Sequence, residues 1–217
     1  FSENFPGITL DGGNLYVDRR RGLDRGLEAL YLAYLEGDLD HGRITGAYAA
    51  GLDALRRGDV AFAYAPQTLK GQVTGPVSWG LTIVDQNQRP ILYDEVLEDA
   101  VGKHLRMKAA WQERELLKLA PQAITVIHEP YMASFGSSFI GLTRDQVIAL
   151  FEEVFSGLRG LKGVHCSGNT DWSILLNTSM DVLSFDAYDY SQTLVTYAED
   201  LGRVLDQGGL IAWGIVP

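Results

Sequence analysis

The sequence predicts an α/β protein built on a parallel sheet, a (β/α)8 TIM-type barrel that is incomplete within this chain. Segments with apolar residues at helical spacing alternate with short segments rich in valine and isoleucine that are bounded by glycine or proline. Strands that alternate with helices pair in parallel, because a crossover helix is the usual connection between parallel neighbours. No linker or repeat divides the chain, so residues 1–217 are expected to form a single domain.

Helices are expected wherever apolar residues recur every three or four positions. Two lie within residues 18–57 and are separated near Gly37, and the others cover 94–120, 143–157, 171–178 and 191–207. An aspartate at 94 can cap the long helix, and Thr143 with Gln146 forms a capping-box pattern ahead of the next one. The pair Gly208–Gly209 is a common C-terminal stop for the last helix.

Strands are expected over five short segments, namely 72–76, 123–130, 163–168, 181–190 and 210–217. The N-terminal segment 5–18 has a Gly12–Gly13 pair between two apolar runs, which indicates a local hairpin. We therefore count five or six strands in the parallel system and place the hairpin apart from it.

Two parallel architectures compete, the doubly wound open sheet and the closed barrel. No GxGxxG or GxxxxGK[ST] string follows an expected strand, so the usual nucleotide signatures are missing and the barrel is favoured. A complete barrel usually takes about 250 residues and eight strands. The simplest interpretation is that this chain is a portion of a larger barrel.

Composition excludes several classes of function. Eighteen Lys and Arg against 28 Asp and Glu give a net charge of −10, which disfavours nucleic acid and anionic membranes as partners. No apolar run is long enough for a spanning helix and the first residues lack a signal-peptide layout, so a cytoplasmic location is expected. The single cysteine, Cys166, cannot form an internal disulfide or build a multi-thiolate metal site alone.

Polar and aromatic residues follow each expected strand, where a parallel barrel places its catalytic groups. The five strand ends carry Thr74-Gly75-Pro76, His128-Glu129-Pro130, His165-Cys166-Ser167-Gly168-Asn169, Ser184-Phe185-Asp186-Ala187-Tyr188 and Trp213-Gly214. Structural roles suffice for Thr74 and Ser184 as partners of backbone groups, and for Asp171, two residues after the third strand end, as a helix cap. His41 and His104, on expected helices among charged residues, are interpreted as solvated surface.

A functional interpretation is favoured for the charged strand ends. Glu129 beside His128 at the floor of a cleft is costly unless it is used or paired. Asp186 ends an apolar run, so at the mouth of a barrel its carboxylate needs a partner or a ligand. We expect Glu129, His165, Asp186 and Trp213 to meet at one rim.

The strand endings resemble the superfamily that joins uroporphyrinogen decarboxylase to cobalamin-independent methionine synthase and the corrinoid-dependent thiol methyltransferases. The segment Gly163–Thr170 looks like its H-x-C-G-N strand end, and Val73–Pro76 looks like its threonine–glycine–proline turn. His128-Glu129-Pro130 is similar to its Asp-Glu-Pro strand end, and Asp181–Asp186 is similar to its D-v-x-s-x-[DE] strand. The motifs follow the family's order between Val73 and Pro217, and the family fold is a (β/α)8 barrel.

The resemblance implies a site and a cofactor. Methyltransferases of this superfamily bind zinc through the His and Cys of H-x-C and an acidic residue on the next strand. By position, His165 fits the histidine and Asp186 the acidic ligand, and Cys166 would be a further metal ligand. His128, Glu129 and Asp186 would be catalytic. Thr74, Ser167, Asn169, Tyr188 and Trp213 would bind substrate. Side chains alternate along a strand, however, so Ser167 shares the face of His165, and Cys166 turns inward only if the strand has a bulge.

Three functions are compatible with these residues. The first, which is the expected function, is a methyltransferase that transfers a methyl group to a small-molecule thiol deprotonated by zinc, with a folate or a corrinoid protein as methyl donor. The second is a metal-free, uroporphyrinogen decarboxylase-like enzyme in which His128 or His165 moves protons, with Arg19–Arg21 as the only arginine run available for a carboxylate. The third is a non-catalytic barrel that binds a ligand. The oligomeric state stays open.

Overall fold

The computed structural model describes residues 1–137 and 140–216, and its main element is a five-stranded sheet in the order β3-β5-β6-β7-β8. The strands are β3 (Thr68–Thr74), β5 (Gln122–His128), β6 (Leu161–Cys166), β7 (Val182–Asp186) and β8 (Leu210–Gly214). Every neighbouring pair is parallel, which confirms the α/β class and the parallel pairing expected from the sequence. The described strands form an open sheet, with β3 and β8 at its edges.

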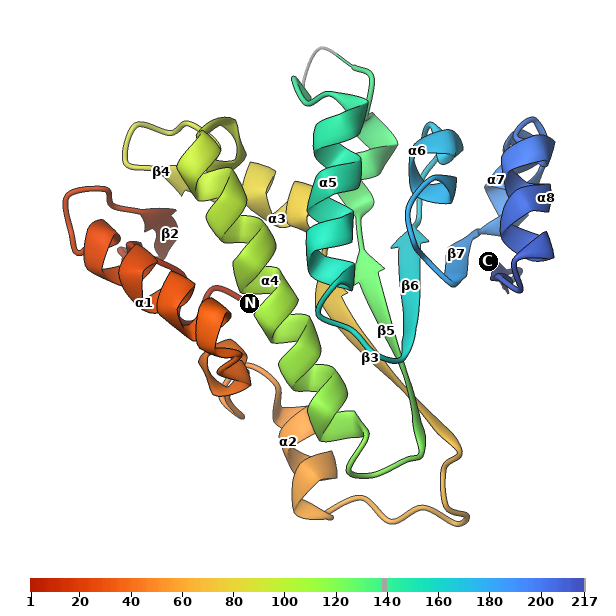
Figure 1. Cartoon of the computed structure of the whole chain (residues 1–217), viewed down its shortest axis with the longest axis horizontal. Helices are drawn as coiled ribbons and strands as arrows, with labels where there is room; N and C mark the ends of the chain where they lie inside the picture. Colours follow the sequence, from red (N-terminus) through yellow and green to blue (C-terminus); the bar gives the residue numbers. More distant parts are fainter. Residues whose placement is uncertain (138–139, 217) are drawn as a thin grey trace.

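Helices connect the strands and pack in front of the sheet in the view of Figure 1. The α-helices are α1 (Leu23–Glu36), α2 (Ala50–Arg57), α3 (Pro76–Thr82), α4 (Glu95–Leu116), α5 (Arg144–Phe155), α6 (Trp172–Leu176), α7 (Ala187–Val195) and α8 (Ala198–Asp206). Three 3-10 helices are η1 (Leu39–Gly42), η2 (Ile91–Tyr93) and η3 (Pro130–Ser134). None of the helices in the described ranges is long and apolar enough to cross a membrane.

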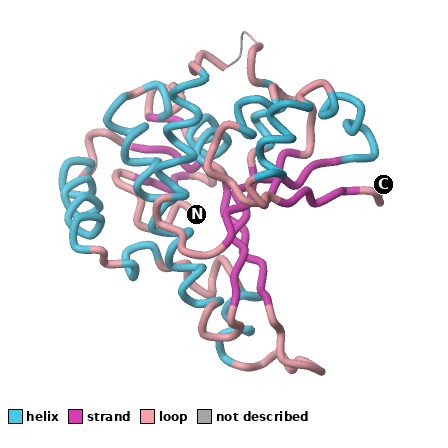
Figure 2. The backbone as a smooth tube through the Cα atoms, turned by 45° about the vertical axis from the view of Figure 1, so that its right-hand side comes forward, coloured by secondary structure: helices cyan, strands magenta, loops and turns pink. Residues whose placement is uncertain are grey.

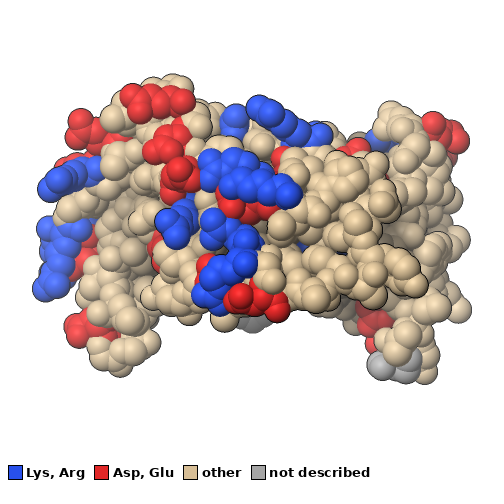
Figure 3. Space-filling view, turned by 90° about the horizontal axis from the view of Figure 1, so that it is seen from below, with Lys and Arg blue, Asp and Glu red and all other residues tan. Residues whose placement is uncertain are grey.

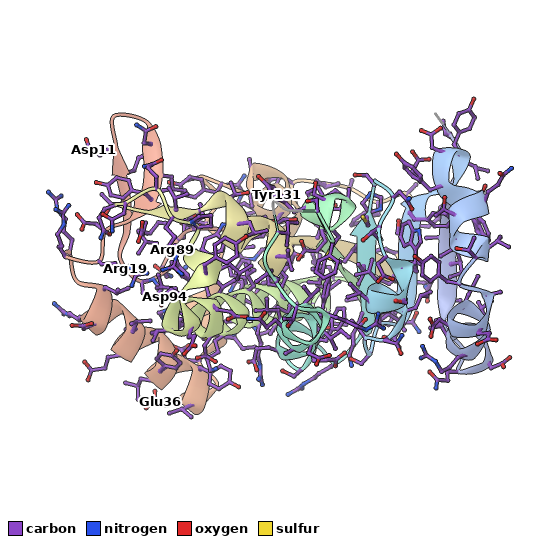
Figure 4. All side chains as sticks on the ribbon, turned by 90° about the horizontal axis from the view of Figure 1, so that it is seen from above. Asp11, Arg19, Glu36, Arg89, Asp94 and Tyr131 are labelled. Carbon is purple, nitrogen blue, oxygen red and sulfur yellow. The ribbon has the colours of Figure 1, made fainter. Side chains whose placement is uncertain are left out.

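A small second sheet lies beside α1. It contains β1 (Ile8–Asp11), β2 (Asn14–Val17) and β4 (Val84–Asp85), and the antiparallel β1–β2 pair confirms the expected hairpin. Gly12 and Gly13 form its turn at φ 54° and 86°, where a side chain would be strained. Arg19 ties this sheet to the start of α4 through an ion pair of 2.9 Å with Asp94, which lies close by in Figure 4.

The helices cover one face of the main sheet, as the turned view in Figure 2 shows. Alternation places Val73, Ile127, Val164 and Leu183 on this covered face, and all four are fully buried. The other face, which we call the open face, carries Lys70, Gln72 and Leu161 as exposed side chains. The strands thus follow one another in sequence order with helices on a single face, whereas doubly wound sheets place helices on both faces.

Helix caps follow the expected signals. The Asp94 side chain accepts hydrogen bonds from the amides of Val96 and Leu97 at the start of α4. Both hydrogen bonds of the Thr143–Gln146 capping box are present at α5, and Asp171 caps α6 as expected.

Several expected boundaries are wrong. The second N-terminal helix covers only Ala50–Arg57, and the helix expected at 191–207 is two helices, α7 and α8, that meet at 196–197. The strand expected to continue to residue 190 ends at Asp186, whose side chain caps α7. Helix α3 was not expected, because Gly75–Pro76 was interpreted as a turn at a strand end, whereas proline is also favoured at the first position of a helix.

His104 is not on the surface, which corrects the expectation for this residue. It lies on the buried side of α4 with no exposed area, and its ring packs against those of Phe5 and Trp79 at centroid distances of 5.2 and 5.8 Å. His41 lies in η1 and is half-buried. The expectation was based on the charged neighbours of His104 in the sequence. It is wrong because α4, a helix of 22 residues that crosses the domain, buries most of its circumference.

Candidate functional site

A row of polar side chains crosses the open face at the carboxyl ends of the strands. The pairing register aligns Thr74 with His128, His128 with His165, and His165 with Ser184. Because paired residues of parallel strands point to the same side, the four side chains share one face and one level. Motifs that follow one another along the chain therefore lie on neighbouring strands of the sheet.

Two histidines form the centre of this row. The rings of His128 and His165 stack with centroids 4.4 Å apart and planes within 15° of parallel. Nδ1 of His165 and Oγ of Ser184 lie 2.9 Å apart in a hydrogen bond, which fixes the orientation of that ring. Both histidines are half-buried, so each keeps an edge toward the open face.

The surroundings keep both imidazoles neutral near pH 7. Burial lowers the pKa of His128, and the positive charge of Lys70 lowers it further. Burial also lowers the pKa of His165, with added repulsion from His128 and Lys70 and a partial opposing effect of Asp186. The two rings are therefore proton acceptors at neutral pH and strong proton donors once protonated.

Lys70 is a site residue that sequence reasoning missed. It lies four residues before Thr74 on β3, on the open face, and its exposed side chain has no hydrogen bond or ion pair within the described part of the chain. The strand was expected to begin only at residue 72, which left Lys70 outside it. Residues an even number of positions apart lie on the same face of an extended strand, and Lys70 is four positions from Thr74. This spacing was the signal that could have identified Lys70.

Asp186 is brought near His165 but is already engaged. Its Oδ1 accepts hydrogen bonds of 3.0 and 3.3 Å from the amides of Tyr188 and Asp189 at the start of α7. A carboxylate at this position stabilises the helix end and also favours the charged form of His165.

Replacing Asp186 with asparagine should separate these two roles. The amide oxygen can keep the cap of α7, whereas the negative charge beside His165 is lost. We expect the pKa of His165 to fall further while the free energy of unfolding changes by less than about 1 kcal/mol. Titration of the imidazole proton signals by NMR measures the first quantity, and an unchanged His165 pKa would contradict this placement of the carboxylate.

Glu129 is turned away from the open face and is fully buried. Its carboxylate accepts hydrogen bonds of 2.8 Å from the amides of Val77 and Ser78, and one of 2.6 Å from the Ser78 hydroxyl. Burial outweighs these bonds and raises the pKa of Glu129 to about 7. The cost of burying this carboxyl group, which the sequence suggested was a sign of function, is offset here by the first turn of α3.

Gly75 makes this arrangement possible. A Cβ atom at position 75 would lie 2.0 Å from Cδ of Glu129, so only glycine allows the carboxyl group to reach the start of α3. The two motifs thus depend on each other. The threonine–glycine–proline motif provides room at Gly75 and leads into the backbone amides at the start of α3, and the His-Glu-Pro motif provides the carboxylate that accepts their hydrogen bonds.

The residues present do not fit a zinc ion. Zinc ligands converge on one point about 2 Å from each donor atom, whereas the two stacked imidazole rings lie in nearly parallel planes with centroids 4.4 Å apart, so lone pairs in those planes do not meet at one point. Cys166 lies on the covered face with no exposed area, and burial raises the pKa of its thiol to about 11. Strand β6 is regular as far as Cys166, so no bulge turns the sulfur toward His165. Within the described ranges, no three His, Cys, Asp or Glu side chains gather as a metal site would require.

The remaining expected residues lie in loops, in a helix and on the covered side of the sheet. Ser167 and Asn169 are exposed in the loop after β6, and Tyr188 is exposed in the first turn of α7. Trp213 pairs in register with Phe185 and stacks obliquely on its ring at 5.5 Å, which places it on the covered side of the sheet, opposite His165. Of the four residues expected at one rim, the structure brings His165 and Asp186 together and turns Glu129 and Trp213 to the other face.

The arginine run is also away from this row. Arg19 binds Asp85 and Asp94, and Arg20 binds Asp18, all beside the small sheet. Among the described residues, Lys70 is therefore the lysine or arginine whose positive charge lowers the pKa of both His128 and His165.

Comparisons with known proteins assign no role to these residues. No family model matches the chain, and no curated protein or solved structure matches it significantly.

Proposed function

We propose that the main sheet is part of the wall of a (β/α)8 barrel and that its open face is the barrel interior. Sequential parallel strands with helices on a single face support this proposal. Parallel sheets are normally buried on both faces. In a closed barrel, the row of Thr74, His128, His165 and Ser184 would lie at the catalytic end.

We infer that the protein is a metal-free enzyme that transfers protons on a small carboxylate substrate, in the manner of the uroporphyrinogen decarboxylase-like branch. The stacked His128–His165 pair on the open face is the observation that carries this inference. Lys70 supplies the positive charge that attracts a carboxylate. In the reaction, the bond between carbon and carboxylate breaks, CO2 leaves, and the carbon takes a proton from a protonated imidazole.

A thiol methyltransferase is the second candidate. The motif order that resembles the superfamily favours it, as does the nearness of Asp186 to His165, because the resemblance implies zinc ligands from a histidine and from an acidic residue on the next strand. The two candidates require opposite protonation states, since a metal ligand must be a neutral imidazole whereas a proton donor must be an imidazolium.

The pH dependence of turnover therefore distinguishes them. Because the pKa of His165 is lowered from 6.5, its protonated form becomes abundant only below pH 6.5. We expect decarboxylation to accelerate as the pH falls from 7.5 to below 6.5 and to resist treatment with a chelator. Uroporphyrinogen with CO2 release, and thiols with methylcobalamin or methyltetrahydrofolate, are the substrates to compare.

His165→Asn and His128→Asn are expected to lower kcat/KM for decarboxylation by about 100-fold or more, with His41→Asn as the matched control. Zinc bound in stoichiometric amount, lost in His165→Asn and coupled to thiol methylation, would establish the second candidate instead. Saturable substrate binding without turnover by either reaction would identify a binding protein.

A further inference from the structure

A second cleft lies at the opposite end of the main sheet from the histidine row. It has a volume of about 610 Å³ and is formed by the end of α1, the second half of α4 and the loop between α5 and β6. That loop leads into the amino end of β6, so the cleft and the histidine pair are separated by the length of the strand. This volume is in the range typical of small-molecule sites.

The cleft combines an apolar floor with a basic rim. Its floor includes Met107, Ala110 and Leu158, which are largely buried. Four cationic side chains line it, namely Arg106, Arg114, Lys118 and Arg159. Figure 3 views the molecule from below and shows Lys and Arg side chains gathered near the centre of this end. Arg106, Arg114 and Lys118 are each paired with a carboxylate outside the lining, so Arg159 is the cation of the rim that has no carboxylate partner among the described residues.

The one acidic residue of the lining does not neutralise this rim by direct pairing. The carboxylate of Glu113 is buried and accepts hydrogen bonds of 2.9 and 2.8 Å from the backbone amides of Arg159 and Gly160. It therefore serves to hold the loop between α5 and β6 in place.

The basic side chains keep donors for a ligand. Arg159 is exposed, and its guanidinium makes no hydrogen bond or ion pair in the ranges that the structure covers. Arg106 uses Nη1 for the Tyr34 hydroxyl and Glu153, and Arg114 uses Nε and Nη2 for Glu115 and Asp40. A guanidinium has five N–H donors, so Nη2 of Arg106 and Nη1 of Arg114 are still available.

We propose that this cleft binds a small amphiphilic organic anion, with its apolar body on the Met107–Ala110 floor and its carboxylate or phosphate group between Arg106, Arg114 and Arg159. Forked guanidinium groups match the oxygens of either acid group. A purely inorganic anion would leave the apolar floor exposed to water, and a neutral apolar molecule would leave Arg159 without a partner.

Calorimetric titration of the full chain with octanoate, octyl phosphate and 1-octanol tests this proposal. We expect saturable binding of at least one of the two anions and at least 10-fold weaker binding of the alcohol. The anion that binds more tightly identifies the acid group. Affinity should fall as sodium chloride is raised, because salt screens the exposed arginines.

Arg159→Glu is the decisive variant, and Arg25→Glu, an exposed arginine near the start of α1, makes the same change of charge away from the cleft. We expect the first to weaken anion binding at least 10-fold and the second to leave it within twofold, with unchanged melting temperatures. If Arg159→Glu fails to fold, Arg159→Gln replaces it. Equal binding of octanol, equal loss in both variants, or no saturable binding of either anion would overturn the proposal.

Discussion

Replacing Gly75 with alanine is expected to destabilise the protein by about 3 kcal/mol. The added Cβ would lie 2.0 Å from Cδ and 2.1 Å from Oε1 of Glu129. Glu129 cannot move aside cheaply, because leaving its place would break three buried hydrogen bonds to the start of α3. The backbone of Gly75 is extended, with φ −79° and ψ 154°, so the loss is steric and does not reflect a glycine-only conformation. Urea unfolding measures the change in free energy.

Gly202 provides the matched control for this substitution. It lies inside α8, and a Cβ atom added there would meet nothing within 4 Å, so Gly202→Ala should stabilise the protein by about 0.5–1 kcal/mol through helix propensity. Glu129→Ala should also destabilise the protein, but the double variant Gly75→Ala/Glu129→Ala should be more stable than the sum of the two losses predicts, by about 1 kcal/mol or more. Additive losses would show that the two strand ends do not interlock.

Acid is expected to destabilise the protein through His104. Complete burial, with a further contribution from the charge of Lys108, lowers the pKa of His104 to about 3. In the unfolded chain the pKa of a histidine is about 6.5. Between these values the unfolded state holds a proton that the folded state does not, so the free energy of unfolding falls as the pH drops below about 6.5. The largest loss by pH 3 is about 4–5 kcal/mol, which urea unfolding at a series of pH values measures.

His104→Gln is the variant that isolates this effect. Glutamine cannot take up a proton and can keep a donor near the carbonyl oxygen of Phe1, which His104 contacts through Nε2 at 2.8 Å. The variant should be less stable than the wild type at pH 7, and the difference should shrink as the pH falls toward 4. His41→Gln, at a half-buried position, should change the pH dependence much less. A constant difference between His104→Gln and the wild type at all pH values would contradict the buried neutral imidazole.

Much of the fold could be predicted because it depends on local patterns. The Thr143–Gln146 capping box, the Asp94 cap and the Gly12–Gly13 turn are determined by residues within a few positions of each other, and all three are present. The five parallel strands were found because valine and isoleucine gather in them. Helix boundaries near residues 187–198 were missed, because the Asp186 cap ends a strand and begins a helix at the same residue.

The candidate site was only partly predictable. Register between strands decides which side chains meet, and it aligned His128 with His165 and Ser184 as their positions at strand ends suggested. Lys70 was missed because the start of β3 was placed too late, and Trp213 was assigned to the wrong face because its parity relative to Phe185 was not considered. When the expected pairing of a strand is wrong by one residue, every side chain of that strand is assigned to the wrong face of the sheet.

The sequence by itself determined the five parallel strands, the polar strand ends and the side of β6 to which Cys166 points, since alternation along a strand is a property of the backbone. Only the tertiary structure decided what the charged groups do. Glu129 serves the amides of α3, His104 is buried against Phe5 and Trp79, and Lys70 acts on the histidine pair. These contacts join residues far apart in the chain, 52 positions for Glu129 and Val77 and 103 for His104 and Phe1, and the energy of a buried charge depends on its neighbours in space, which no local pattern specifies.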